Sequence, residues 1–142
     1  MKVRQYVRYR LQVSHFQPKS DPHVVPMDLQ TDFDKIGPYY LDLGVEDMTS
    51  DPFPEYVQAV GYMKDGRLLA FLMVMALEDD GTLEIAAVST HPEHRGKGYG
   101  TAIISWAADY IMKRGFVPSL TTGRENHSMR HAAEKIGMKV DS

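Results

Sequence analysis

A glycine-rich stretch near the middle of the chain constrains its fold most strongly. Arg95-Gly96-Lys97-Gly98-Tyr99-Gly100 follows an apolar run typical of a strand, residues 82–90, and precedes apolar residues at helical spacing over residues 101–114. A strand, a glycine-rich turn and the first turn of a helix bring unpaired backbone N–H groups and the positive end of the helix dipole together. The sequence therefore predicts an anion site, to which Arg95 and Lys97 add positive charge.

Two common phosphate-binding motifs fit this stretch poorly. A Walker loop requires Ser or Thr directly after its Lys, whereas Lys97 is followed by Gly98. A dinucleotide fingerprint spaces its glycines as G-x-G-x-x-G, whereas these glycines stand at positions 96, 98 and 100. A plain glycine-rich turn between strand and helix is the structural alternative.

The rest of the chain predicts a mixed α+β fold with a mainly antiparallel sheet flanked by helices. Strands are expected at residues 3–13, 56–63, 67–77, 82–90 and 116–122, with a hairpin turn at Asp65-Gly66. Helices are expected at residues 29–43, broken at Gly37-Pro38, and at residues 101–114 and 126–137. Asp28 or Thr31 is expected to cap the first helix. Residues 17–26 and 44–54 are expected to be loops.

Composition excludes several classes of function. A chain of 142 residues fits one domain, residues 1–142. A formal net charge of −3 argues against nucleic acid as the main partner. We expect no membrane partner, because there is no apolar run of spanning length and no signal-peptide pattern. The absence of cysteine excludes disulfides, thiolate metal sites and a Cys nucleophile, and favours a cytoplasmic location.

Two motifs together resemble a known family. Arg-x-x-Gly-x-Gly, preceded by Thr90-His91-Pro92-Glu93-His94, resembles the acyl-CoA pyrophosphate loop of the GNAT superfamily of N-acetyltransferases. Downstream, Asn126 begins a segment that ends in Glu134-Lys135-Ile136-Gly137-Met138, similar to the second signature of that superfamily. The two matches span about residues 82–138, in the expected order and spacing.

This resemblance implies acetyl-CoA as co-substrate and direct acetyl transfer to a primary amine in a ternary complex. It implies that the pyrophosphate binds at Arg95, Gly96, Lys97, Gly98, Tyr99, Gly100 and Thr101. It also implies that backbone groups at Val88, Ser89 and Thr90 bind pantetheine and polarise the thioester. Asn126 resembles the Asn that reaches the pantetheine arm, although an ordinary helix cap is an equally common role and both could hold.

Two positions bear on the chemistry. Glu84 lies between the apolar residues Leu83 and Ile85, surroundings that suit a carboxylate acting as general base, as in some members of the superfamily. The alternative is that Glu84 points outward from a half-exposed face. Ala133 stands where many members carry a Tyr that protonates the leaving thiolate. Ser128 and His131 lie nearby, but each is expected to be a surface residue.

The segment 28–55 suggests what the acceptor is. It carries eight acidic residues and one basic residue, Lys35; the acids are Asp28, Asp32, Asp34, Asp42, Glu46, Asp47, Asp51 and Glu55. In the family this segment borders the acceptor site, so a cationic small-molecule or peptide amine would be attracted there; a solvated loop face is the alternative. Tyr39, Tyr40 and Phe53 could line the acceptor site or belong to the core.

The histidine pairs His91/His94 and His127/His131 lack a recognisable metal motif, so no metal site is expected and all four are expected to be solvated.

Only five residues follow Gly137, where the family adds further strands. Either the first strand compensates, or a second subunit in a homodimer supplies an edge, or the sequence is short. The sequence thus predicts an N-acetyltransferase. A non-catalytic acyl-CoA-binding or regulatory module and a nucleotide-phosphate binder are the rival readings.

Overall fold

The computed structural model describes residues 5–45 and 55–141, and within them the chain forms a seven-stranded sheet. The strands are β1 (Tyr6–Arg10), β2 (Val24–Met27), β3 (Gln58–Lys64), β4 (Arg67–Met75), β5 (Thr82–Thr90), β6 (Val117–Gly123) and β7 (Lys139–Val140). The helices are α1 (Phe33–Asp42), α2 (Tyr99–Lys113) and α3 (His127–Lys135), with short 3-10 turns η1 (Val13–His15) and η2 (Pro92–His94).

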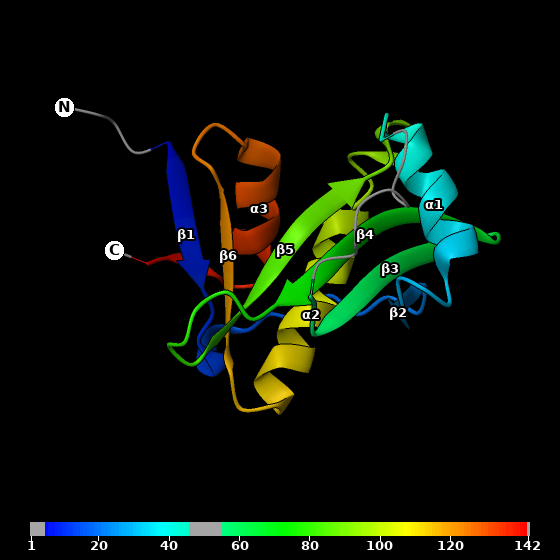
Figure 1. Cartoon of the computed structure of the whole chain (residues 1–142). Coiled ribbons are helices and arrows are strands. Elements are labelled where there is room, and N and C mark those ends of the chain that lie inside the picture. The colour runs from blue at the N-terminus through cyan, green and yellow to red at the C-terminus, as the bar shows by residue number, and fades with distance from the viewer. Residues whose placement is uncertain (1–4, 46–54, 142) are drawn as a thin grey trace.

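The strands follow the order β2-β3-β4-β5-β6-β1-β7 (Figure 1). Neighbouring strands are antiparallel except β5 and β6, which are parallel. The expected α+β class is therefore confirmed. The hairpin between β3 and β4 is also confirmed, since Asp65 and Gly66 take the positive φ values of 52° and 77° that a two-residue turn of this kind requires.

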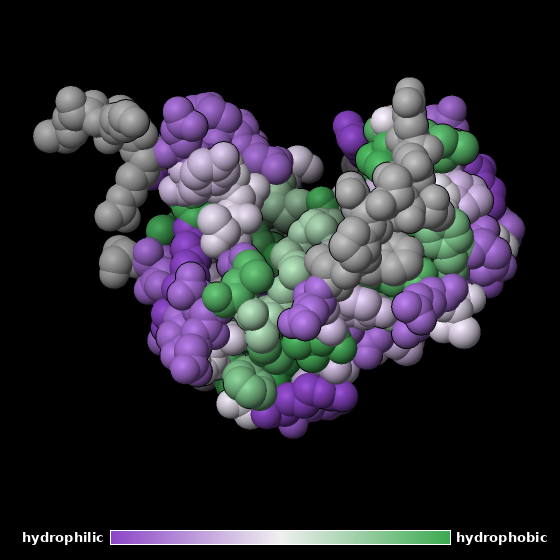
Figure 2. All heavy atoms as spheres, in the orientation of Figure 1, coloured by the Kyte–Doolittle hydropathy of each residue, from purple (hydrophilic) through white to green (hydrophobic). Residues whose placement is uncertain are grey.

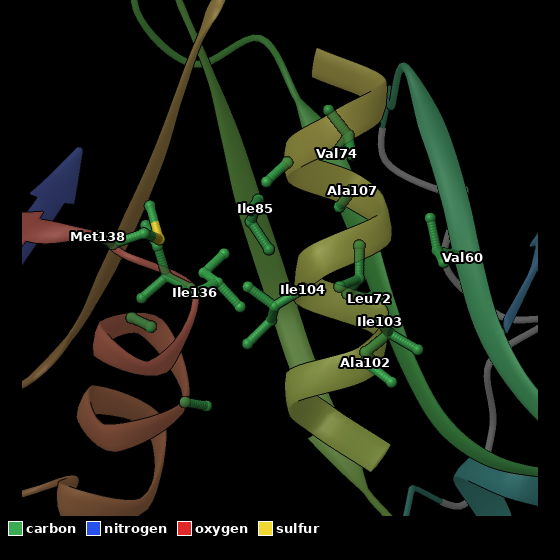
Figure 3. Close-up of a cluster of buried hydrophobic side chains, with 14 of the residues drawn as sticks. Val60, Leu72, Val74, Ile85, Ala102, Ile103, Ile104, Ala107, Ile136 and Met138 are labelled. Atoms are coloured by element: carbon green, nitrogen blue, oxygen red, sulfur yellow. The ribbon is translucent and has the colours of Figure 1, made fainter. Parts of the chain in front are cut away.

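Two apolar clusters hold helices on opposite faces of the sheet (Figure 1). On one face, α2 buries Ile103, Ile104 and Ala107 against strands β3 to β5, and Ile136 after α3 joins the same cluster (Figure 3). On the other face, α1 packs Ile36 and its neighbours against β4. Each buried Ile contributes about 1.5–3 kcal/mol to folding, so the sheet is fixed from both sides.

A bulge in β5 shapes the centre of the sheet. The pairing with β4 shifts register between Met73↔Ala86 and Phe71↔Ser89, and Ala87 in the bulge has a φ of 54°. The extra residue reverses the side-chain alternation. Ile85 and Val88 both pack in the α2 cluster, whereas Ser89 faces α1.

Strands β5 and β6 separate beyond their first residues. Their parallel pairing covers only Thr82, Leu83 and Glu84 of β5, opposite Val117, Pro118 and Ser119 of β6. In the part of the chain that the structure describes, their pairing goes no further, although β5 runs on to Thr90 and β6 to Gly123. The sheet therefore opens as a wedge in the middle.

Three sequence predictions need correction. Residues 24–27 form β2, although 24–26 were expected to belong to the loop 17–26. Pro26 is tolerated in this strand because β2 lies at the edge of the sheet and needs no amide donor there. The first strand ends at Arg10, and Val13 is exposed in η1. Helix α1 continues through Pro38, which is exposed and leaves one carbonyl of the helix without its N–H donor.

The ends of the described chain meet at one edge of the sheet. β1 lies between β6 and β7, pairing Tyr6–Arg10 with residues 119–123 on one side and Tyr9–Arg10 with Lys139–Val140 on the other. The first strand therefore lies beside β6. Within the described residues, no helix is long and apolar enough to cross a membrane.

Candidate functional site

A pocket of about 590 Å³ lies at the end of β5, beyond the residues of β5 that pair with β6. Its walls come from the end of β5, the glycine-rich loop, the first turns of α2 and one face of α3. The lining residues are Val88, Ser89, Thr90, Arg95, Gly96, Gly98, Gly100, Thr101, Ile104, Asn126, Ser128, Met129, His131, Ala132 and Lys135. Nine of the twelve site residues predicted from the sequence are among them, drawn together from three separate segments.

The loop is shaped by two glycines in the left-handed region. Gly96 has a φ of 79°, and Gly98, the N-cap of α2, has a φ of 85°. A Cβ at either position would meet no heavy atom within 4 Å. Glycine is therefore favoured here because it adopts a positive φ and leaves the space above the loop open. The unpaired N–H groups of the first turn of α2 follow directly, which makes this end of the pocket attractive to an anion.

Arg95 adds a cation to the same end of the pocket. Its Nε donates a hydrogen bond to the Thr90 carbonyl oxygen at 3.3 Å, which ties the loop back to the end of β5. The side chain is otherwise exposed. Its guanidinium therefore keeps donors for a phosphate oxygen.

Lys97 and Tyr99 are not among the residues that line the pocket. Nζ of Lys97 lies 3.4 Å from Nδ1 of His94. The ring of Tyr99 stacks on Tyr62, with centroids 4.0 Å apart and an interplanar angle of 19°. Desolvation and the Lys97 ammonium lower the pKa of His94, so its ring is neutral at pH 7. The predicted role of these two residues at the pyrophosphate stays a prediction.

Asn126 serves as the cap of α3 and also lines the pocket. Its Oδ1 accepts a hydrogen bond from the Met129 N–H at 3.2 Å. The sequence reasoning allowed both roles, and the geometry is compatible with both.

Helix α3 also brings residues that the sequence reasoning missed or set aside. Ser128, His131 and Lys135 line the pocket; Ser128 and His131 are exposed, as expected, and also belong to its wall. Their spacing of three and four residues was the available signal, because it places the three of them on one face of α3. His131 and Lys135 add basic groups to the pocket wall.

Glu84 lies where β5 and β6 separate. It faces Ser119 in the last paired position. Its Oε1 accepts a hydrogen bond from the Thr121 hydroxyl at 3.0 Å. Because Leu83 and Ile85 belong to the α2 cluster, Glu84 lies on the α1 face of the sheet, half-buried. The carboxylate thus stands beside the opening of the wedge rather than in the wall of the pocket.

His91 is buried, which corrects the expectation that it is solvated. Its Nδ1 accepts a hydrogen bond from the Glu93 N–H at 3.1 Å, and its Nε2 lies 3.3 Å from Oδ2 of Asp42 at the end of α1. His91, Glu93 and His94 offer ligand atoms within 4.8 Å of one another. Both ring nitrogens of His91 already have hydrogen-bond partners, so we read this residue as a link between α1 and the loop.

Ala133 is fully buried in the α2 cluster and is not part of the pocket lining. Met129 and Ala132 form the wall of the pocket at this turn of α3. The position that would carry a Tyr in many relatives therefore offers no group to a leaving thiolate.

The acidic segment is only partly within the described residues. Asp28, Asp32, Asp34, Asp42 and Glu55 are described; Glu46, Asp47, Asp51 and Phe53 lie outside the described ranges, as does most of the expected loop 44–54. Hydrogen bonds from Thr31 and Gln30 lower the pKa of Asp28, which stays ionised. Asp28 caps this turn and not α1 itself, which begins after Asp32.

Tyr39 and Tyr40 of α1 belong mainly to the core. Tyr39 is 2% exposed and packs on Phe71, and Tyr40 is partly buried against the same cluster. Burial raises the pKa of both phenols. The Tyr39 hydroxyl nevertheless reaches Ser89, a pocket residue, at 2.7 Å.

Comparisons with known proteins agree with this geometry. A family model described as acetyltransferase (GNAT) family matches residues 23–138. None of the curated proteins gives a significant match.

Solved structures share the fold at low sequence identity. A GNAT-family protein from Novosphingobium aromaticivorans DSM 12444 superposes with a TM-score of 0.75 at 23% identity, covering 96% of this chain and 59% of that one. A ribosomal-protein-alanine N-acetyltransferase from Brucella melitensis biovar Abortus 2308 gives 0.63 at 23% identity, covering 84% and 92%. The ribosomal-protein-S18-alanine N-acetyltransferase from Escherichia coli gives 0.63 at 16% identity, covering 84% and 78%. The chain spans under two thirds of the Novosphingobium protein.

Proposed function

Because this chain belongs to the acetyltransferase (GNAT) family, we propose that it transfers the acetyl group of acetyl-CoA to a primary amine by direct attack in a ternary complex. The observation that carries the proposal is the meeting of the β5–β6 wedge and the glycine-rich loop in one pocket. The loop suits a pyrophosphate, and the wedge suits a narrow, polar arm leading from it to a reacting centre.

Different residues of the pocket would bind different parts of acetyl-CoA. The pyrophosphate would lie at Gly96, Gly98 and the first turn of α2, with Arg95 as counter-charge. The pantetheine arm would follow the edge of β5 beyond its pairing with β6, where it would bond to backbone groups of Val88 and to the N–H of Thr90, whose carbonyl accepts from Arg95. Backbone donors at this edge would also polarise the thioester carbonyl.

Glu84 is our candidate for the general base. An amine attacks only in its neutral form, so a proton must leave the acceptor. The carboxylate stands beside the opening of the wedge, on the α1 face, and the Thr121 hydroxyl holds one of its oxygens in place. A proton could pass to it directly or through one water.

The acceptor would approach from the α1 face. Figure 2 shows this face hollowed between the β6–α3 side and the α1 side, with apolar residues at the bottom of the hollow. Asp28 and Asp32 lie before the start of α1 and Asp42 lies at its end, where it also contacts His91 and Arg67. These carboxylates would attract a cationic amine, in a small molecule or a peptide. Two structural neighbours are named for acetylating a protein alanine, which is compatible with a peptide acceptor here.

Turnover tests the proposal directly. Thiol release from acetyl-CoA should depend on a primary amine, and screening polyamines, aminoglycosides and peptides would identify the acceptor. The Glu84→Gln variant should lose about 10²–10⁴-fold in kcat, as expected for a general base, with unchanged affinity for acetyl-CoA. Glu78→Gln, an exposed carboxylate in the β4–β5 turn, is the matched control. Equal kcat for Glu84→Gln and wild type at every pH would refute the assignment.

A non-catalytic acyl-CoA-binding module is the second candidate, and the buried Ala133 favours it. Such a module would bind acetyl-CoA with similar affinity but release no thiol with any acceptor. Binding and turnover measured on the same preparation therefore separate the two.

A further inference from the structure

A hydroxyl pair connects the core beneath α1 to the pocket. The Tyr39 hydroxyl lies 2.7 Å from Oγ of Ser89, and Ser89 lines the pocket immediately after the bulge in β5. Tyr39 is 2% exposed, so its hydroxyl must find its partner within the protein.

The bulge is what brings this serine to the α1 face. Without the extra residue at Ala87, regular alternation from Ile85 would place Ser89 on the α2 face. With it, Val88 faces the α2 cluster and Ser89 faces Tyr39. Ser89 thus stands at the wedge, between the pocket and the α1 face from which the acceptor would come.

Either hydroxyl could donate the hydrogen bond between Tyr39 and Ser89, and burial favours Tyr39 as the donor because a buried phenol proton needs an acceptor within the protein. Desolvation raises the pKa of Tyr39, against a smaller lowering by the Ser89 hydroxyl, so the phenol keeps its proton. A serine hydroxyl has one hydrogen and two acceptor sites. Burial also raises the pKa of Tyr40, against a smaller lowering by a hydrogen bond with Ser89, so Ser89 has two tyrosine neighbours. If both phenols donate to its two acceptor sites, the serine hydrogen stays available for a group in the pocket.

Resting on the proposed function, we infer that Ser89 is a catalytic residue whose hydroxyl, oriented by Tyr39 as a positioning residue, donates a hydrogen bond to the departing sulfur of CoA. In the step concerned, the amine nitrogen bonds to the thioester carbon, the C–S bond breaks, and its electron pair goes to sulfur. The proton of the amine goes to the base. Ser89 keeps its proton, so no alkoxide and no buried tyrosinate form.

A hydrogen bond suffices for this leaving group. A thiol side chain has a pKa of about 8.5, so a thiolate stabilised by one donor can leave near neutral pH without full proton transfer. Ala133, Met129 and Ala132 supply no side-chain donor at this turn of α3, although Ser128 and His131 of the same helix also line the pocket. The β5 side of the wedge supplies one.

The bound thiol reports on this contact apart from turnover. Since the chain contains no cysteine, thiolate absorbance in a complex with CoA comes from the ligand. In a titration kept below pH 10, the pKa of bound CoA should lie below its value in solution. Ser89→Ala should raise it, Ser89→Thr should retain the wild-type value, and Tyr39→Phe should give an intermediate value.

Kinetics should follow the same order. We expect Ser89→Ala to lower kcat by about tenfold to a hundredfold, the usual effect of one hydrogen bond to a charged group, with a smaller change in KM. Ser89→Ala alone leaves the buried Tyr39 hydroxyl without its partner. The double variant Ser89→Ala/Tyr39→Phe removes that hydroxyl as well, so it should fold but still have a low kcat. Tyr110→Phe, on α2 and outside the pocket lining, is the control.

Two results would overturn the inference in distinguishable ways. If Ser89→Ala binds CoA with unchanged thiol pKa and keeps the wild-type kcat, the serine role is wrong while the proposed function stands. If the wild type binds neither CoA nor desulfo-CoA, the proposed function itself fails and the inference falls with it.

Discussion

At the scale of single residues, Tyr9 shows how the pocket wall is held. This tyrosine of β1 is fully buried. Its hydroxyl donates to Oε2 of Glu134 at 2.6 Å and accepts from Nε of Arg130 at 3.0 Å. Both partners belong to α3, the helix that carries Asn126 and Lys135 into the pocket. A side chain outside the site therefore helps to fix one of its walls.

We predict that Tyr9→Phe lowers the free energy of unfolding by about 1–3 kcal/mol, because it leaves two charged groups without their partner. Thermal denaturation would measure the loss, and Tyr6→Phe, 65% exposed in the same strand, should change little. A Tyr9→Phe protein as stable as wild type would show that this network carries no net stabilisation.

The same network predicts a pH dependence. Desolvation and the Glu134 carboxylate raise the pKa of Tyr9. A tyrosine whose pKa is raised by folding stabilises the folded protein fully at a pH below its pKa in the unfolded chain, about 10. This contribution is lost as the pH rises through the pKa of the folded state. Wild type should therefore lose stability above pH 10 more steeply than Tyr9→Phe.

Sequence reasoning reached some of these residues and not others. Within the expected strand 3–13, Val7, Tyr9 and Leu11 alternate with polar residues, which predicts that Tyr9 points inward, and Tyr9 is indeed buried. The partners of its hydroxyl lie 121 and 125 positions away in the sequence, and no local pattern specifies such a contact. His91 was misjudged for the same reason, since Asp42 is 49 positions away.

At the scale of elements, the strand–loop–helix unit is the part that local chemistry specifies best. Glycines at positive φ, a helix of the expected extent and the Asn126 cap all follow from short-range rules. The bulge at Ala87 does not, because alanine has no preference for a φ of 54°. Tertiary packing imposes this conformation. For that reason the sequence predicted only a backbone role for Ser89 and no role for its side chain.

We predict that Gly98→Val weakens binding of acetyl-CoA at least tenfold, because a branched side chain would occupy the space above the loop where the pyrophosphate approaches. Gly66→Val is a matched control: Gly66 has a similar positive φ of 77° and equally open surroundings, but lies in the β3–β4 hairpin. Both variants should lose similar stability, and only Gly98→Val should lose affinity. Equal affinities would show that the donor binds elsewhere.

At the scale of the whole molecule, β1 completes the half of the sheet that carries the pocket. The family match begins at residue 23, yet β1, residues 6–10, is inserted between β6 and β7 and pairs along β6 as it diverges from β5. The wedge therefore depends on a segment outside the matched region. Composition and periodicity predicted the fold class, whereas the strand order could not be predicted because it depends on which distant edges meet.

The central claim is that the wedge and the glycine-rich loop form a site for acetyl-CoA, and calorimetric titration tests it most directly. The account predicts saturable binding of acetyl-CoA with micromolar affinity, and at least tenfold weaker binding of ATP and NADH, which carry phosphates but no pantetheine. Binding of ATP as tight as that of acetyl-CoA, or no heat with acetyl-CoA at millimolar concentration, would contradict it.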